Sequence, residues 1–192
     1  MDPHLSRACQ SNQSIIFFKV ARARIIIGKI YFATGNQGKI EEMKPLFEER
    51  EVEIEQVDVD VPEIDTMDVE DVARRKAWDS YNKAVEKGFI SEGDMLIVED
   101  TGFYVESLGG FPGAEAAYFS RRAGVGKLLP LLEDEENRKA YFKTALGVFK
   151  NGEVSIFSGK LNGRVPEKIR GDSHDYLPYN SFFILNQREE DK

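Results

Sequence analysis

At 192 residues, the chain is long enough for one well-cored domain, and its 41% hydrophobic and 31% charged residues are ordinary for a globular protein. A formal net charge of −8 opposes broad electrostatic contact with DNA or RNA, and no apolar run approaches the ~20 residues that span a bilayer. One cysteine and two histidines exclude an internal disulfide, a cysteine-based zinc site and a histidine-rich metal centre. From the charge and the apolar runs, we expect a cytoplasmic protein without nucleic-acid or membrane partners.

The first 24 residues carry no periodic pattern of a folded element. A polar segment is followed by a short apolar burst at Ile15–Phe18 and then by a basic segment. The burst is too short for a secretory signal, and the arginines and serines only faintly suggest a transit peptide. We therefore interpret residues 1–24 as an extension or a misassigned start, and residues 25–192 as a single domain.

A buried strand followed by a polar turn is the first strong signal. The β-branched and aromatic run ends at Ile30–Ala33, and Thr34–Lys39 then leads into apolar residues at helical spacing. Backbone amides and the positive end of a helix point the same way after such a turn, so Thr34, Asn36 and Lys39 could bind phosphate there. A capped turn with a surface lysine fits the same spacing.

A helix is predicted over Val69–Lys87, after an alternating strand at residues 52–61. Lys76 falls on the apolar face of this helix, between Val72 and Ala73. A lysine in that position either extends to solvent or meets an anion. The sequence leaves both possibilities open.

Two adjacent carboxylates give the strongest chemical signal. A buried strand opens at Leu96–Val98 and is expected to end at Glu99 and Asp100, where Thr101-Gly102 would turn the chain into a short hairpin. The carboxylates repel each other and resist desolvation, and a hard cation such as Mg²⁺ would relieve both effects. A strand that ends in a solvated acidic turn is the alternative.

Turn signals punctuate the remainder of the chain. The glycine-rich loop Gly109–Gly113 would complete one wall of a cleft. Residues 123–133 suggest a short helix, and the apolar runs on both sides of Asn151-Gly152 predict a β-hairpin. A final short strand is expected at Asn180–Leu185.

Four of these motifs occur in an order that resembles the inosine triphosphate pyrophosphatase family, also called the XTP/dITP diphosphatases. They are Thr34–Lys39 after the first strand, Pro62-Glu63 before the helix that contains Lys76, Glu99–Gly102, and Gly109–Gly113. The resemblance implies an α/β fold in which helices flank a mixed central sheet, with two lobes and an active-site cleft. It also implies a homodimer that hydrolyses ITP, dITP and XTP to the monophosphate and pyrophosphate with Mg²⁺.

The resemblance further implies roles for individual residues. Substrate contacts are implied for Thr34, Gly35, Asn36, Lys39, Lys76 and Thr101. Metal contacts are implied for Glu63, Glu99 and Asp100. Asp100 and Lys39 are the expected catalytic residues: Asp100 would orient or deprotonate the attacking water, and Lys39 would neutralise phosphate charge. Which carboxylate is the base and which is only a ligand stays open.

The C-terminal part departs from the family pattern. Residues 177–183 are the nearest match to the base-binding segment, Asn180 stands where the family has aspartate, and no Ser-His-Arg follows. Tyr179 and Asn180 are the candidate contacts to the base, although core packing is the commoner fate of such aromatics. Two other functions therefore stay open: a nucleotide-binding protein of this fold with impaired catalysis, and a pyrophosphatase for modified pyrimidine nucleotides.

Overall fold

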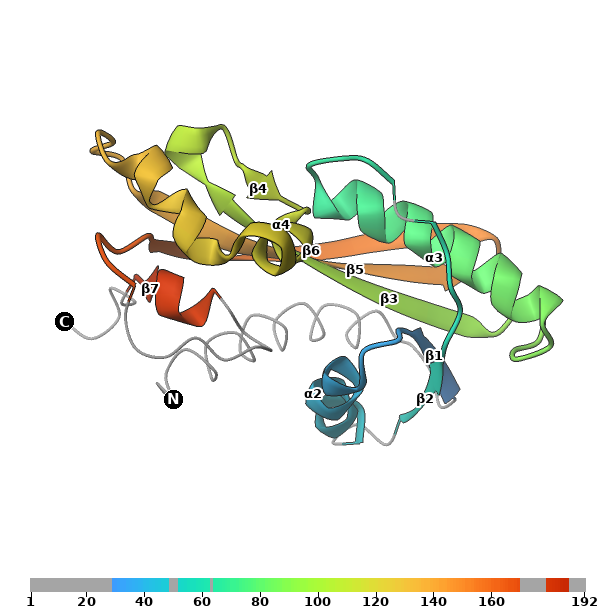
Figure 1. Ribbon diagram of the computed structural model, residues 1–192. Coiled ribbons are helices and arrows are strands. Elements are labelled where there is room, and N and C mark those ends of the chain that lie inside the picture. Colours follow the sequence, from blue (N-terminus) through green and yellow to red (C-terminus); the bar gives the residue numbers. More distant parts are fainter. Residues whose placement is uncertain (1–28, 49–51, 63, 170–178, 187–192) are drawn as a thin grey trace.

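The computed structural model describes residues 29–48, 52–62, 64–169 and 179–186 (Figure 1). The predictions for residues 1–24 therefore lie outside the described residues. The strands are β1 (Lys29–Ala33), β2 (Glu53–Val57), β3 (Met95–Val105), β4 (Pro112–Gly113), β5 (Lys139–Lys150), β6 (Glu153–Arg164) and β7 (Ile184–Leu185). The helices are α2 (Gln37–Glu48), α3 (Val69–Glu86) and α4 (Ala116–Ala123), with short 3₁₀ segments η1 (Glu106–Leu108), η2 (Val125–Leu128), η3 (Pro130–Leu132) and η4 (Asn180–Phe182). None of the helices in these ranges is long and apolar enough to cross a membrane.

The strands form one mixed sheet, as predicted. Their order is β2-β1-β3-β5-β6-β7, and β4 pairs with β3. β1 runs parallel to both β2 and β3, whereas β3, β5, β6 and β7 pair in antiparallel fashion. Helix α3 covers one face of the sheet and α2 the other (Figure 1), and this arrangement confirms the α/β class.

Strand β3 runs through the predicted break at Glu99, so the prediction of a hairpin at Thr101-Gly102 is wrong. Every residue from Leu96 to Val105 pairs with β5. Strand β5 therefore provides the hydrogen-bond partners for the backbone of this segment, and a local sequence pattern does not reveal those partners. Gly102 lies inside the strand, and β4 approaches it so closely that a side chain would not fit there. A Cβ atom on Gly102 would lie 2.6 Å from the carbonyl oxygen of Gly113.

The predicted hairpin is confirmed and the helix predicted over residues 123–133 is wrong. Asn151 and Gly152 connect β5 to β6 with φ angles of 52° and 80°, the positive values that a two-residue hairpin turn needs. Helix α4 instead ends at Ala123, because Gly124 leaves the helical region with φ 80° and ψ 139°. The strand predicted at Asn180–Leu185 forms only in its last two residues, β7.

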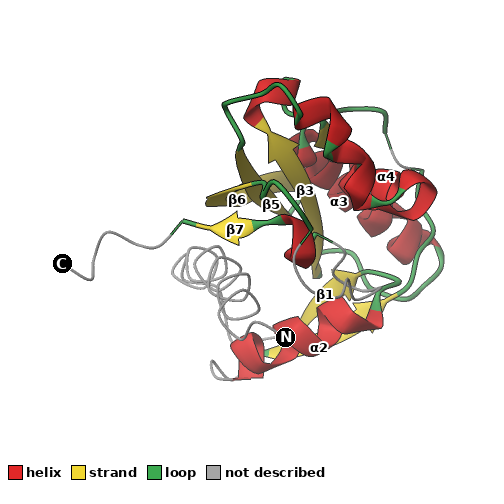
Figure 2. Ribbon diagram, turned by 60° about the vertical axis from the view of Figure 1, so that its left-hand side comes forward, coloured by secondary structure: helices red, strands yellow, loops and turns green. Residues whose placement is uncertain are grey.

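Two apolar clusters pack on the α2 face of the sheet. One cluster packs α2 against the sheet and includes Met43 and Ile97, and the other gathers α4, η2, η4 and the end of β3 and includes Phe103 and Phe182. Figure 2 shows α2 beside β1, apart from α4. Side chains alternate along β3, so Glu99 and Thr101 fall on this same face between the clusters. Together with Thr144 of β5, opposite Thr101, they form what we call the polar waist.

Lys143 of β5 fastens the first turn of α3 to the other face of the sheet. Its Nζ lies 2.8 Å from Asp68 Oδ1 and 2.8 Å from Glu70 Oε1. Asp68 caps α3 by accepting from the amide of Glu70, and the Ser158 hydroxyl donates to Glu70 Oε1 at 2.8 Å. Burial raises the pKa of Asp68, but hydrogen bonds from Lys143 and the Glu70 amide outweigh it, and the bond from Lys143 lowers the pKa of Glu70.

We expect Lys143→Met to destabilise the protein at neutral pH and to flatten its acid dependence. The folded-state pKa values of Asp68 and Glu70 lie below their ordinary values, so their stabilising contribution is present at neutral pH and is lost as pH falls through those values. Between about pH 5 and pH 3, the wild type should therefore lose more stability than the variant. Urea unfolding across this range measures both curves, and parallel curves would contradict the assignment.

Candidate active site

The edge of β3 is open where the parallel strand β1 stops. β1 pairs with β3 only from Ile30–Phe32 to Met95–Ile97, and β4 joins the same edge at Phe103 and Tyr104. Residues 98–102 lie between these two pairings. β1 and β2 end at the same side of the sheet, so the segments that follow them also start here. In open α/β sheets, ligands bind beyond the carboxyl ends of parallel strands.

The turn between β1 and α2 is held by one hydrogen bond within the turn and another from β2. The Thr34 hydroxyl accepts from the Asn36 amide at 3.1 Å, and the side-chain amide of Gln56 donates to the Thr34 carbonyl at 2.8 Å. Gly35 lies against Asp58, whose Oδ1 would be 3.4 Å from a Cβ atom on Gly35. The first turn of α2 holds no acidic residue, so its positive end is not neutralised from within that turn.

Lys39 reaches from the first turn of α2 to β3. Its Nζ forms an ion pair with Glu99 Oε2 and donates to the Glu99 carbonyl at 3.3 Å. The Glu99 side chain is only 3% exposed, whereas that of Lys39 is 29% exposed. The Thr101 hydroxyl donates to the other carboxylate oxygen, Oε1. Both oxygens of Glu99 thus have partners within the protein, and its role as a metal ligand stays a prediction.

Asp100 lies on the opposite face of β3 from Glu99, because successive side chains of a strand alternate. It is partly exposed and shares the α3 face with Val98. Lys76 is partly buried in α3, seven residues before Lys83, whose Nζ donates to the Asp60 carbonyl. Two helical turns separate the lysines, so Lys76 lies on the flank of α3 that faces the segment after β2.

The predicted residues that the structure describes thus lie on both faces of β3. The turn, Lys39, Glu99 and Thr101 lie on the α2 side, whereas Asp100 and Lys76 belong to the α3 side. Glu63 and the side chain of Asn180 are outside the described residues, and their roles stay predictions. Within the described ranges, no three carboxylate, histidine or cysteine side chains form a cluster that could hold a metal ion.

Tyr179 lies in the core, as the alternative to base stacking predicted. It is 6% exposed, and its hydroxyl donates to the Ala116 carbonyl at 2.7 Å. Its ring centroid lies 4.7 Å from that of Phe103. Burial raises the pKa of the Tyr179 phenol. A side chain enclosed in this way is not placed to stack on a purine, so the predicted substrate contact is not supported.

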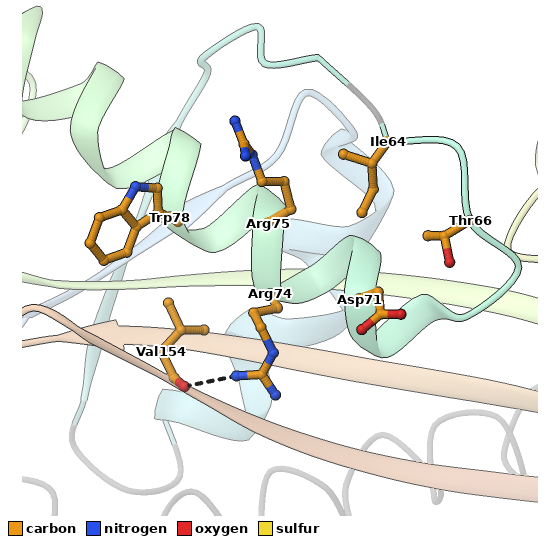
Figure 3. Close-up of a pocket in the computed structure, with 7 residues that line it drawn as sticks. All are labelled: Ile64, Thr66, Asp71, Arg74, Arg75, Trp78 and Val154. Carbon is orange, nitrogen blue, oxygen red and sulfur yellow. Dashed lines mark hydrogen bonds between the residues drawn. The ribbon is translucent and has the colours of Figure 1, made fainter.

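A surface groove of about 560 Å³ lies along the outer side of α3 (Figure 3). Its lining residues are Ile64, Thr66, Asp71, Arg74, Arg75, Trp78 and Val154. Arg74 reaches across to β6 and donates to the Val154 carbonyl at 3.4 Å. Arg74 and Trp78 lie about half a turn around α3 from Lys76, so the groove and the open edge are on different sides of the helix.

Thr144 is a buried polar residue of the site that sequence reasoning missed. It is 4% exposed, and its hydroxyl oxygen lies 2.8 Å from that of Thr101. A single threonine in an apolar strand has no motif around it. Only the register between β3 and β5, which sets Thr101 opposite Thr144, reveals the contact.

Comparisons with known proteins identify the family of the chain. A family model described as the Ham1 family matches residues 30–191. The dITP/XTP pyrophosphatase of Methanopyrus kandleri is 38% identical over 157 residues, which cover 81% of this chain and 78% of that relative. The dITP/XTP pyrophosphatase of Pyrococcus horikoshii is 36% identical over 162 residues, which cover 84% of this chain and 82% of that relative.

Solved structures of similar proteins share the fold. The nucleoside-triphosphatase, or dITP/XTP pyrophosphatase, of Mycobacterium abscessus superposes with a TM-score of 0.64 at 26% identity, covering 82% of this chain and 83% of that chain. The Staphylococcus aureus Ham1 protein superposes with a TM-score of 0.66 at 24% identity, covering 82% and 81% respectively. The family resemblance predicted from the four motifs is confirmed: the chain belongs to the Ham1 family.

Proposed function

We propose that the protein is an Mg²⁺-dependent nucleoside triphosphate pyrophosphohydrolase that converts ITP, dITP and XTP to the monophosphate and pyrophosphate. Relatives that share over a third of their aligned residues with the chain are named dITP/XTP pyrophosphatases. The observation that carries the proposal is that the ammonium group of Lys39 contacts β3 at Glu99, next to Asp100 in the chain, where neither β1 nor β4 pairs with that edge of β3. This hydrolysis needs a cation that neutralises phosphate charge and a carboxylate that orients and deprotonates the attacking water.

The α2 side of the edge would bind the triphosphate. The positive end of α2 favours an anion there, since its first turn holds no acidic residue. Lys39 adds a full charge, and its pairing with Glu99 holds the ammonium group against β3 while 29% of the side chain stays exposed. Lys76, on the flank of α3, would contact the phosphates from the other face.

Asp100 would position the attacking water. A partly exposed carboxylate at a strand edge suits a hard cation, so Asp100 together with Glu63 would hold Mg²⁺. When bound, the ion would neutralise charge on the phosphate oxygens. Asp100 would orient the water and accept its proton as the oxygen bonds to the α-phosphorus. The bond from that phosphorus to the bridging oxygen then breaks, and pyrophosphate leaves with the bond's electrons.

We also propose a cytoplasmic homodimer, as the family resemblance implies. Large apolar side chains are exposed on the described surface, among them Trp78 at 47% and Phe89 at 49%. Such side chains are common at contacts between subunits. Sedimentation equilibrium distinguishes a dimer from a monomer directly.

A panel of nucleotides tests the proposed substrate class. Purified protein with Mg²⁺ should release monophosphate and pyrophosphate from ITP, dITP and XTP with kcat/KM about 100-fold above that for ATP and GTP, because the base decides selectivity. Removal of the metal with EDTA should abolish turnover, and added Mg²⁺ should restore it. Binding of ITP without products would favour the alternative of impaired catalysis. Preference for modified pyrimidine nucleotides would favour the other alternative.

Tyr179→Phe should change stability without changing substrate affinity. The variant leaves the Ala116 carbonyl without the hydroxyl that donates to it at 2.7 Å, so we expect a loss of about 1–2 kcal/mol in the free energy of unfolding. KM for ITP should stay within about twofold of the wild-type value, because a core side chain does not contact the base. Urea titration and steady-state kinetics measure the two effects. A large rise in KM at wild-type stability would restore the predicted base contact.

A further inference from the structure

A chain of two hydroxyl groups, that of buried Thr144 and that of partly exposed Thr101, crosses the polar waist from β5 to β3. Thr144 and Thr101 face each other in the register of these strands, with their oxygens 2.8 Å apart. Thr101 also contacts Glu99 Oε1. Thr144 and Glu99 are 4% and 3% exposed. Hydroxyl groups are costly to bury without partners, and the apolar clusters on both sides offer none.

The direction of the hydrogen bonds follows from proton counting. A threonine hydroxyl carries one proton, and a carboxylate oxygen can only accept. Thr101 therefore donates to Glu99, and Thr144 must be the donor in its contact with Thr101. The chain runs from Thr144 to Thr101 to Glu99 Oε1, while Lys39 binds Glu99 Oε2 from α2. Bonds aligned in this way polarise and strengthen one another.

The chain fixes the rotation of the Glu99 carboxylate. With Oε1 anchored by Thr101, Oε2 is directed to the ammonium group of Lys39, which is also bonded to the Glu99 carbonyl. Loss of the first donor would free the Thr101 hydroxyl to turn and would weaken the anchor on Oε1. Lys39 would then be held less firmly at the place where a phosphate binds, and small displacements of such a group are costly to catalysis.

We propose that Thr144 is a positioning residue for the phosphate-binding lysine: through Thr101 and Glu99, its hydroxyl holds the ammonium group of Lys39 at the open edge of β3. This inference rests on the proposed pyrophosphohydrolase function. Thr144 does not touch the substrate in this arrangement. Its removal should therefore act only through Lys39.

A double-mutant cycle with Thr144→Val and Lys39→Met tests the inference. Valine matches the shape of threonine without its hydroxyl, and we expect kcat/KM for ITP to fall about tenfold. In the K39M background, T144V should change kcat/KM by less than about twofold, since the group that Thr144 positions is already absent. Thr144→Ser, which keeps the hydroxyl, should retain activity close to wild type. If T144V lowers kcat/KM by the same factor in the wild-type and K39M backgrounds, the inference is overturned.

Ser80→Ala is the matched control. Ser80 is 1% exposed, and its hydroxyl has no hydrogen-bond partner among the described residues. S80A therefore removes a buried hydroxyl outside the chain, and its kinetics should match wild type. If T144V fails to fold, Thr144→Ala removes the same hydroxyl and replaces it in the cycle.

Binding of inorganic pyrophosphate with Mg²⁺ distinguishes the positioning role of Thr144 from the proposed pyrophosphohydrolase function. Calorimetry of the same four proteins should show an effect of T144V on Kd where Lys39 is present and no such effect in the K39M background. A wild type that couples in this way yet releases no pyrophosphate from ITP would refute the proposed function and support the positioning role. Turnover by the wild type without coupling in either measurement would refute the positioning role alone.

Discussion

Asp100→Asn should lower kcat for ITP hydrolysis by about 10³-fold while leaving the fold intact. The amide has nearly the size of the carboxylate but carries no charge, so it neither accepts the proton of the attacking water nor binds a hard cation well. Asp100 is partly exposed on β3. The expected loss is therefore chemical, and KM should change much less than kcat. Steady-state kinetics with a pyrophosphate assay measures both.

Asp71→Asn is the matched control for this variant. Asp71 is exposed in the first turn of α3 and lines the outer groove, on the side of the helix away from Lys76. The same charge change there should leave kcat within about twofold of wild type, since the residue is remote from the open edge. A D100N protein that keeps more than about a tenth of wild-type kcat would contradict the role given to Asp100.

Lys39→Met should lower both activity and stability. Loss of the cation from the phosphate site should reduce kcat/KM for ITP by about 10² to 10³-fold. The same change leaves the carboxylate of Glu99, only 3% exposed, without the ammonium group that pairs with it. Because Lys39 itself is partly exposed, we expect a loss of about 2 kcal/mol in the free energy of unfolding, less than for a fully buried pair.

The double variant Lys39→Met/Glu99→Gln separates the two losses. Glutamine removes the orphaned charge, so stability should recover in part, while activity should stay as low as in K39M because the phosphate cation is still absent. Lys44→Met is the control on the same helix. Lys44 is exposed and its ion pair with Glu48 is long, at 3.8 Å, so its removal should lower the free energy of unfolding by less than about 0.5 kcal/mol. Recovery of activity in the double variant would show that Lys39 serves only the fold.

Local pattern was sufficient for much of the fold. The β-branched residues and the polar turn that follows them predict β1 and α2, and Asn151-Gly152 predicts the β5–β6 hairpin. Each of these elements depends on residues that are neighbours in sequence. Strand β3 was cut short in the prediction because acidic residues in mid-strand look like a strand end. The burial of Glu99 depends on Lys39 and on β5, which are distant in sequence.

The candidate site was predictable as a set of residues but not as an arrangement. The motifs identified the turn, Lys39 and Asp100, yet only the structure shows that the alternation of β3 separates Glu99 from Asp100 onto opposite faces and that Glu99 pairs with Lys39. Tyr179 illustrates the converse. Its place beside a motif suggested a substrate contact, while its packing against Phe103 makes it a core residue.

Hydrolysis of ITP in ¹⁸O-labelled water, followed by ³¹P NMR, tests most directly whether this edge of the sheet directs water to the α-phosphorus. The wild-type protein with Mg²⁺ should give inosine monophosphate that carries the label and pyrophosphate that does not. D100N should give neither product at a comparable rate. Inosine diphosphate with labelled orthophosphate, or label in the pyrophosphate, would place the attack on another phosphorus and contradict the assignment of Asp100 and Lys39.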